Sequence, residues 1–136
     1  MWKYEGREVT DEDIVGHIGF VYQITNRANG MRYIGKKSLT KIKTRQVKGK
    51  KKREKVESDW KTYWSSSDRL KLDVQLYGEH IFDREILRFC SSKSECSYYE
   101  AKYQFEHDVL LSDQWYNDFI MVRVNSRHLK STKKVT

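Results

Sequence analysis

The densest cluster of chemically active side chains in the sequence is one basic segment, residues 36–55. It holds eleven Lys or Arg residues and a single acid, Glu54, whereas the rest of the chain has sixteen basic and eighteen acidic residues. A solvated charged face usually has acids among its bases, and a run of like charges repels itself. We therefore expect a polyanion to neutralise this segment, and a phosphate backbone suits that charge. A solubilising loop is the alternative, and a membrane surface is a weaker candidate because no apolar helical face accompanies the charges.

Two tyrosines lie on two short runs separated by a turn signal. Residues 18–25 are rich in β-branched and aromatic side chains, residues 31–36 form a second run, and Asn29-Gly30 lies between them. This pattern predicts a β-hairpin, because Asn-Gly readily adopts the positive φ angles of a tight turn. Taken alone, Tyr22 and Tyr33 are cross-strand packing residues of that hairpin.

The hairpin resembles the GIY-YIG nuclease family, whose two paired strands carry the two tripeptides of the name. The corresponding tripeptides of this chain are Phe20-Val21-Tyr22 and Tyr33-Ile34-Gly35. The second tripeptide matches without change, whereas the first departs and its glycine comes one residue early, as Gly19. The resemblance covers roughly residues 18–117, and the run 58–67 is similar to small bacteriophage-type, homing-endonuclease-like members.

The resemblance implies further site residues along the chain. Glu100, followed by Tyr103, matches the family's metal-binding glutamate on a long helix, and Asn117 matches its asparagine. The family arginine follows the second strand, where Arg45 is the nearest candidate and Arg53 the second. The implied catalytic residues are therefore Tyr22, Tyr33, Arg45, Glu100 and Asn117.

The function implied by the resemblance is metal-dependent hydrolysis of DNA phosphodiester bonds. Glu100 would hold one divalent ion, Mg²⁺ or Mn²⁺, which keeps most of its waters and stabilises charge on the phosphate. The guanidinium of Arg45 would meet a phosphate oxygen. Asn117 would hold the site or the phosphate in place. A non-catalytic nucleic-acid-binding module on the same fold is the alternative, and a protein-binding module with an acidic partner is a second one.

The two tyrosines would share the handling of the attacking water. The resemblance makes Tyr22 the general base and lets Tyr33 orient the water or the phosphate. An ordinary tyrosine has a pKa of about 10, so nearby cations would have to lower the pKa of Tyr22. Lys36, Lys37 and the metal are the expected sources of that charge.

Double-stranded DNA is the expected partner, and the basic segment is expected to contact its phosphates. Cleavage of both strands by a short enzyme needs two active sites, so a homodimer is one expected arrangement. The candidate DNA-binding residues are Lys36, Lys37, Lys41, Lys43, Lys48, Lys50, Lys51, Lys52, Arg53 and Lys55.

The elements that position these residues predict a small α+β domain, with a central antiparallel sheet of about three strands flanked by helices. Beyond the hairpin, residues 81–89 are expected to form a strand and residues 120–124 a last short one. Trp60 and Trp64 are expected on one face of a helix capped by Ser58-Asp59, and both are assigned to the core.

Two further helices are predicted from their caps. One covers residues 68–77, with Leu72 and Leu76 one turn apart and Gly78 at its end. The other begins after Ser92 or Ser94 and continues to about residue 111.

The chain of 136 residues is the size of one domain. Residues 1–17 are expected to be an acidic lead-in without core residues, with a short helix from Asp11. The resemblance implies a nuclease domain over residues 18–125, with a basic insertion at 36–55 that is expected to be part helix and part mobile loop. Residues 126–136 are expected to form a basic polar tail. Cys90 and Cys96 do not suffice for a disulfide framework, and no secretory signal or membrane span is apparent. The expected location is therefore the cytoplasm, that of a bacterial host if a phage encodes the chain.

Overall fold

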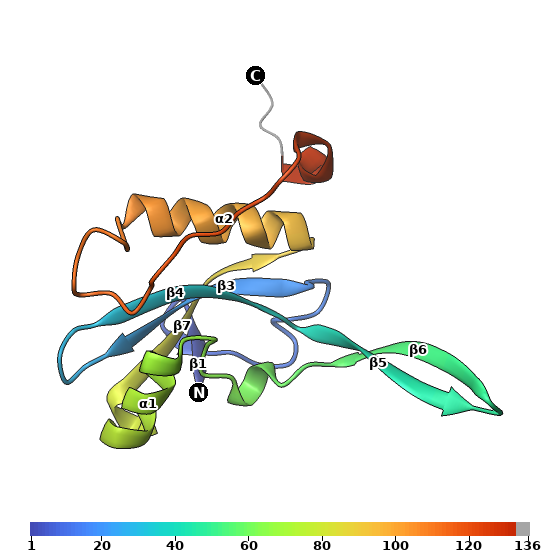
Figure 1. The fold of residues 1–136 in the computed structure, drawn as a ribbon, viewed down its shortest axis with the longest axis horizontal. Helices are drawn as coiled ribbons and strands as arrows, with labels where there is room; N and C mark the ends of the chain where they lie inside the picture. Colours follow the sequence, from blue (N-terminus) through green and yellow to red (C-terminus); the bar gives the residue numbers. More distant parts are fainter. Residues whose placement is uncertain (133–136) are drawn as a thin grey trace.

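The computed structural model describes residues 1–132, so the last four residues of the expected tail lie outside the described part. A mixed five-stranded sheet forms the centre, with α2 on one face and α1 on the other (Figure 1). The elements are β1 (Trp2–Tyr4), β2 (Arg7–Glu8), β3 (Gly19–Asn26), β4 (Arg32–Ser38), β5 (Thr40–Val47), β6 (Lys50–Glu57), η1 (Trp60–Thr62), α1 (Asp68–Tyr77), η2 (Glu79–Ile81), β7 (Phe82–Cys90), α2 (Lys93–Glu106) and η3 (Ser126–Thr132).

The expected α+β class is confirmed, but the sheet is larger than about three strands. Its order is β2-β1-β7-β3-β4, and β1 runs parallel to β7 while the other pairs are antiparallel. The predicted hairpin is present as β3 and β4, with Tyr22 opposite Gly35. Gly30 has a φ of 76° in the connecting turn, as the Asn-Gly signal predicts.

Alternate residues of β3 divide the core into two layers. Phe20, Tyr22 and Ile24 face the side that η1 and α1 cover, whereas Val21 faces α2. Gly19, at the start of β3, allows α2 to approach closely, because a Cβ there would lie 3.1 Å from the Sγ of Cys96. The carbonyl oxygen of Lys37 on β4 would be closer still, at 2.8 Å, so the hairpin itself also leaves no room for a side chain at this position.

The prediction that residues 1–17 contain no core residue is wrong for Trp2. Its side chain is 3% exposed, its ring packs edge-on against Tyr22, and its Nε1 donates to the carbonyl of Trp60 at 2.7 Å. Arg84 of β7 lies between Trp2 and Trp64, with its guanidinium carbon 4.7 Å and 4.2 Å from the two ring centres. The expected helix from Asp11 is absent, since residues 11–16 form turns.

The predicted helix 68–77 is confirmed as α1. Ser67 caps it by accepting from the backbone N–H of Leu70, and Gly78 follows its end. Its buried face carries Leu70 and Val74, whereas Leu72 and Leu76 are exposed.

The start of the second predicted helix is also confirmed, but its end is not. Ser92 caps α2, and the helix ends at Glu106, where His107 begins an irregular turn, rather than near residue 111.

Two other predicted elements do not form as expected. Trp60 and Trp64 do pack in or against the core, yet the segment between them is a single 3-10 turn instead of a helix. Residues 120–124 have no regular secondary structure, so the last predicted strand is wrong.

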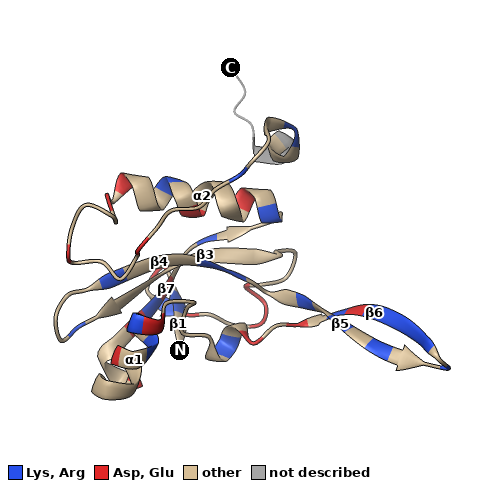
Figure 2. Ribbon diagram, in the orientation of Figure 1, with Lys and Arg blue, Asp and Glu red and all other residues tan. Residues whose placement is uncertain are grey.

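The basic insertion is neither a helix nor a loop. Strands β5 and β6 form a separate two-stranded antiparallel sheet, here called the β5–β6 arm, which projects from the domain (Figure 2). Lys48 and Gly49, with φ angles of 51° and 76°, form the two-residue turn at its tip. The sequence does not predict these strands because nearly all of their side chains are charged or polar, and Lys-Gly is a weaker turn signal than Asn-Gly. No helix among residues 1–132 is long and apolar enough to cross a membrane.

Trp2→Ala should destabilise the whole domain by about 3–5 kcal/mol, because it leaves a cavity where a buried ring packed against β3. Urea denaturation followed by fluorescence of the remaining tryptophans measures the free energy of unfolding. A loss below 1 kcal/mol would mean that β1 is not part of the core.

Candidate active site

Several of the candidate site residues lie on or beside β4, which is an edge strand of the main sheet. The backbone groups of such an edge need partners other than a strand. At its start, Arg32 donates its N–H to the carbonyl of Gln114 at 3.0 Å and accepts from the N–H of Tyr116 at 2.8 Å. Residues 114–116 thus extend the sheet alongside the first part of β4.

Asn117 continues this pairing with its side chain. Its Oδ1 accepts from the N–H of Ile34 at 3.1 Å, and its Nδ2 donates to the carbonyl of Ile34 at 2.8 Å. The Nε2 of Gln104 donates to the same carbonyl at 3.0 Å. Asn117 is 8% exposed, so these bonds form in a largely dry environment where an unpaired group would be costly. Both amide atoms of Asn117 are therefore engaged in holding the middle of β4.

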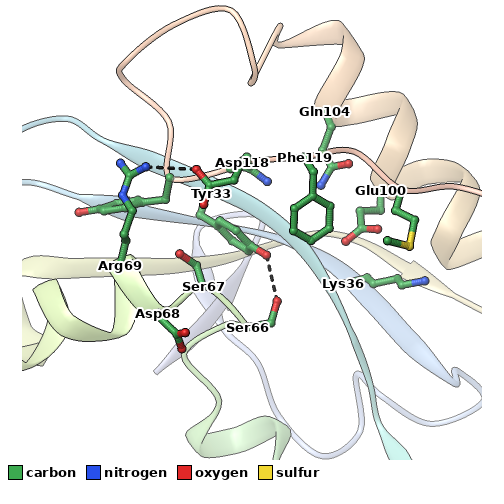
Figure 3. Close-up of a pocket in the computed structure, with 13 residues that line it drawn as sticks. Tyr33, Lys36, Ser66, Ser67, Asp68, Arg69, Glu100, Gln104, Asp118 and Phe119 are labelled. Atoms are coloured by element: carbon green, nitrogen blue, oxygen red, sulfur yellow. Dashed lines mark hydrogen bonds and ion pairs between the residues drawn. The ribbon is translucent and has the colours of Figure 1, made fainter.

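A cavity of about 480 Å³ opens beside β4 where this pairing ends (Figure 3). Its walls come from both sides of the sheet, since the start of α1 approaches from one face and α2 from the other. Three of the residues that the resemblance implies, Tyr33, Glu100 and Asn117, lie in its wall. The complete lining is Tyr33, Lys36, Ser66, Ser67, Asp68, Arg69, Glu100, Gln104, Tyr116, Asn117, Asp118, Phe119 and Met121.

Glu100 is the carboxylate that α2 directs toward β4. Burial raises its pKa above the ordinary value, while the ammonium group and backbone amide of Lys36 lower it in part. Lys36 also donates from Nζ to the Oγ of Ser97 at 2.6 Å, one turn earlier on α2. The site therefore contains a carboxylate whose negative charge is only partly compensated by the protein groups around it.

Tyr22 and Tyr33 meet over Gly35. A Cβ at Gly35 would lie 2.6 Å from the hydroxyl oxygen of Tyr22 and 2.7 Å from Cε1 of Tyr33, so only glycine fits there. The two tyrosines differ in access: Tyr33 lines the cavity and shares a hydrogen bond of 3.2 Å with the Oγ of Ser66, whereas Tyr22 is 1% exposed and lies outside the lining.

The protein groups around Tyr22 raise its pKa instead of lowering it as expected. Burial is the main cause, and Tyr63, Tyr33 and Glu100 add to it. Burial also raises the pKa of Tyr33. Lys37 does not offset this for Tyr22, because its Nζ pairs with Asp59 at 2.6 Å and lies 4.1 Å from the ring centre of Tyr63. Both tyrosines therefore keep their protons at neutral pH in this arrangement.

The arginine in the cavity wall is Arg69. It is the second residue of α1, and its Nη1 lies 3.2 Å from a carboxylate oxygen of the exposed Asp118. Arg45 and Arg53 are absent from the lining, and Arg45 instead pairs with Glu54 on the β5–β6 arm at 3.1 Å. The sequence did contain a signal for Arg69, because Ser67 as a helix cap places it in the first turn of a helix.

These features define an α+β domain whose candidate site lies beside a hairpin with two neighbouring tyrosines and includes a glutamate from a following helix. A family model described as "Putative endonuclease segE, GIY-YIG domain" matches residues 2–120. The chain therefore belongs to this GIY-YIG domain family, as the resemblance predicted. Searches of curated proteins and of solved structures give no match.

Glu100→Gln should raise the melting temperature at pH 7. Because burial raises the pKa of Glu100 in the folded state, ionisation favours unfolding once the pH rises above the unfolded value of about 4.3. The gain should vanish near pH 4 and grow as the pH rises through the folded pKa. Calorimetry at a series of pH values measures it.

Glu106→Gln is the matched control, because its carboxylate is on the same helix but half exposed. It should not raise the melting temperature. An equal gain for both variants, or a gain for Glu100→Gln that persists at pH 4, would contradict the burial of the Glu100 charge.

Proposed function

We propose that this chain is a metal-dependent endonuclease that hydrolyses DNA phosphodiester bonds in the cavity beside β4. The observation that carries the proposal is the approach of Glu100, Tyr33, Lys36 and Arg69 to one cavity. A carboxylate, a hydroxyl and two cations around one space suit the hydrolysis of an anionic ester. Membership of an endonuclease-type domain family supports the same reaction.

Glu100 is the proposed metal ligand. Among residues 1–132 there is no cluster of three or more His, Cys, Asp or Glu side chains suited to a metal. Mg²⁺ does not need such a cluster, because it is commonly held by one or two carboxylates together with waters and substrate phosphate. The partly compensated charge of Glu100 fits that donor set. When bound, Mg²⁺ or Mn²⁺ would stabilise the negative charge that develops on the phosphate and the leaving oxygen.

Lys36 and Arg69 are proposed to bind the scissile phosphate. Arg69 takes the role that the sequence assigned to Arg45, because it is in the cavity wall and its fork can meet phosphate oxygens. Its present partner, Asp118, is exposed, so exchange for a phosphate costs little. The N-terminal turn of α1 adds a positive dipole end to the same wall.

Tyr33 is proposed to contact the attacking water, because its hydroxyl is on the cavity side of Gly35. With a raised pKa it donates a hydrogen bond and orients the water. The role of Tyr22 as general base stays a prediction, since its hydroxyl is buried and its pKa is raised. Asn117 is proposed to act by holding β4, as both atoms of its amide bind Ile34.

Cleavage of supercoiled plasmid in the presence of Mg²⁺ or Mn²⁺ tests the proposal. The wild-type protein should nick or linearise the plasmid, Glu100→Gln should be inactive, and Glu106→Gln should retain full activity. In the same assay Tyr33→Phe should lose more activity than Tyr22→Phe. A wild-type protein that binds the plasmid without cutting it would instead indicate the non-catalytic module, and an active Glu100→Gln would remove Glu100 from the reaction.

Single-turnover cleavage at saturating protein should distinguish the roles of Arg69 and Arg45. Arg69→Ala should lower the rate on the order of 10²-fold or more, which is typical for the loss of one group that stabilises transition-state charge. Arg45→Ala should change the rate only slightly while weakening DNA binding. The opposite ranking would restore Arg45 as the catalytic arginine.

Double-stranded DNA is the proposed substrate, and the cations of the arm are its proposed contacts outside the cavity. Lys36 and Lys37 lie at the root of the arm, where each already binds a side chain of the domain. Two copies of the chain are proposed to act together where both strands are cut, because each copy contributes one cavity.

A further inference from the structure

Among residues 1–132, the β5–β6 arm contacts the domain by side chains only near its base, where Glu57 accepts from the Nε1 of Trp60 at 3.0 Å and pairs with Lys61. Its strands pair over eight positions, from Thr40 opposite Glu57 to Val47 opposite Lys50. At about 3.3 Å per residue this corresponds to an arm of about 25 Å. Most of its side chains are exposed, and Figure 1 shows it extending beyond the end of β4 into open space. An isolated two-stranded hairpin is only marginally stable in water.

Positive charge covers both faces of this ribbon. Directly opposed residues share a face, so the register assigns every cation of β5 and β6 to one face or the other, whereas Lys48 is in the turn at the tip. The first face carries Lys41, Lys43, Arg45, Lys50 and Lys52, and the second carries Lys51, Arg53 and Lys55. Each face also has one acid, Glu54 on the first and Glu57 on the second.

This charge distribution opposes folding of the arm. Arg45 lies directly opposite Lys52, and like charges at opposed positions destabilise a sheet. The Arg45–Glu54 pair is exposed and contributes little. A ribbon that rested with one face on DNA would need cations on that face alone. Cations on both faces are best matched by anions on both sides of the ribbon.

We propose that the β5–β6 arm enters the major groove of duplex DNA with each face turned toward one of the two phosphate backbones. This inference rests on the proposed function in that it takes DNA as the substrate. A ribbon with side chains on both faces is about 10 Å thick, the spacing of packed sheets. The major groove is about 12 Å wide and admits a two-stranded ribbon, whereas the minor groove is about 6 Å wide.

The arm is placed to align the duplex with the cavity. Its first strand begins two residues after the end of β4, the strand that carries Tyr33 and Lys36. At its base, Ser58 donates from Oγ to the carbonyl of Ser38 at 2.6 Å and from its backbone N–H to the carbonyl of Leu39 at 2.9 Å. These bonds tie the arm to the strand that holds the site, so DNA held by the arm also has a defined direction relative to Glu100.

Matched face variants in a Glu100→Gln background test the proposal without interference from cleavage. One variant carries Lys43→Gln, Arg45→Gln and Lys52→Gln on the first face. The other carries Lys51→Gln, Arg53→Gln and Lys55→Gln on the second. Each loses three cations from the middle of the arm, which also relieves repulsion and favours its folding. A control, Lys71→Gln, Lys93→Gln and Lys102→Gln, removes three cations from α1 and α2.

The measured quantity is the slope of log K against log salt concentration for a duplex oligonucleotide. Each lost phosphate contact should reduce its magnitude by about 0.9, so each face variant should lose about 2 to 3 units and the control should lose none. A loss confined to one face would mean that the arm lies flat on DNA, and no loss in either variant would mean that it does not bind DNA. Either result overturns the proposal.

Competition with ligands that bind one groove of DNA tests which groove the arm occupies. Methyl green, a major-groove ligand, should compete with the Glu100→Gln protein, and netropsin, a minor-groove ligand, should not. The reverse order would place the arm in the minor groove and overturn the proposal. Because these are binding measurements, they stay separate from the nuclease proposal: absence of cleavage by the wild type, with both face effects intact, would contradict the reaction alone.

Discussion

The free edge of β4 is the constraint on which the site depends. Strand β4 carries Tyr33 and Lys36; its inner edge pairs with β3, and its outer edge has no neighbouring strand. Residues 114–116 pair the start of the strand, and the amide of Asn117 binds both backbone groups of Ile34. Beyond that point the backbone amide of Lys36 faces the carboxylate of Glu100, and the cavity lies there. The proposed site thus lies where the pairing by residues 114–117 ends.

Glycine makes this edge compatible with two large rings. Gly35 lies opposite Tyr22, and the space that its missing side chain leaves is filled by the rings of Tyr22 and Tyr33. One ring extends into the core toward Trp2, and the other faces the cavity. The tripeptide Tyr33-Ile34-Gly35 therefore contains both a candidate site residue, Tyr33, and a position where only glycine fits, Gly35. For this reason it is a stronger sequence signal than the first tripeptide of this chain.

Local signals predicted the parts of the fold that local physics determines. The Asn29-Gly30 turn, the end of α1 at Gly78 and the cap of α2 at Ser92, one of two candidates, each depend on a few neighbouring residues, and each agrees with the structure. The burial of Trp2 and the cavity position of Arg69 depend on pairing across long sequence separations, with β7 and with residues 115–118. Such contacts have no local pattern. The arm was missed for a different reason, because its strands carry charge where strands usually carry apolar residues.

Manganese-induced broadening of backbone amide signals in an NMR spectrum tests the central claim most directly. Mn²⁺ added in small amounts should first broaden the amides of Lys36 and of residues near Glu100 on α2. The amide of Gly49, at the tip of the arm, should stay sharp, and Glu100→Gln should remove the effect. Broadening centred on another part of the chain, or broadening unchanged by Glu100→Gln, would contradict a metal-dependent site at the outer edge of β4.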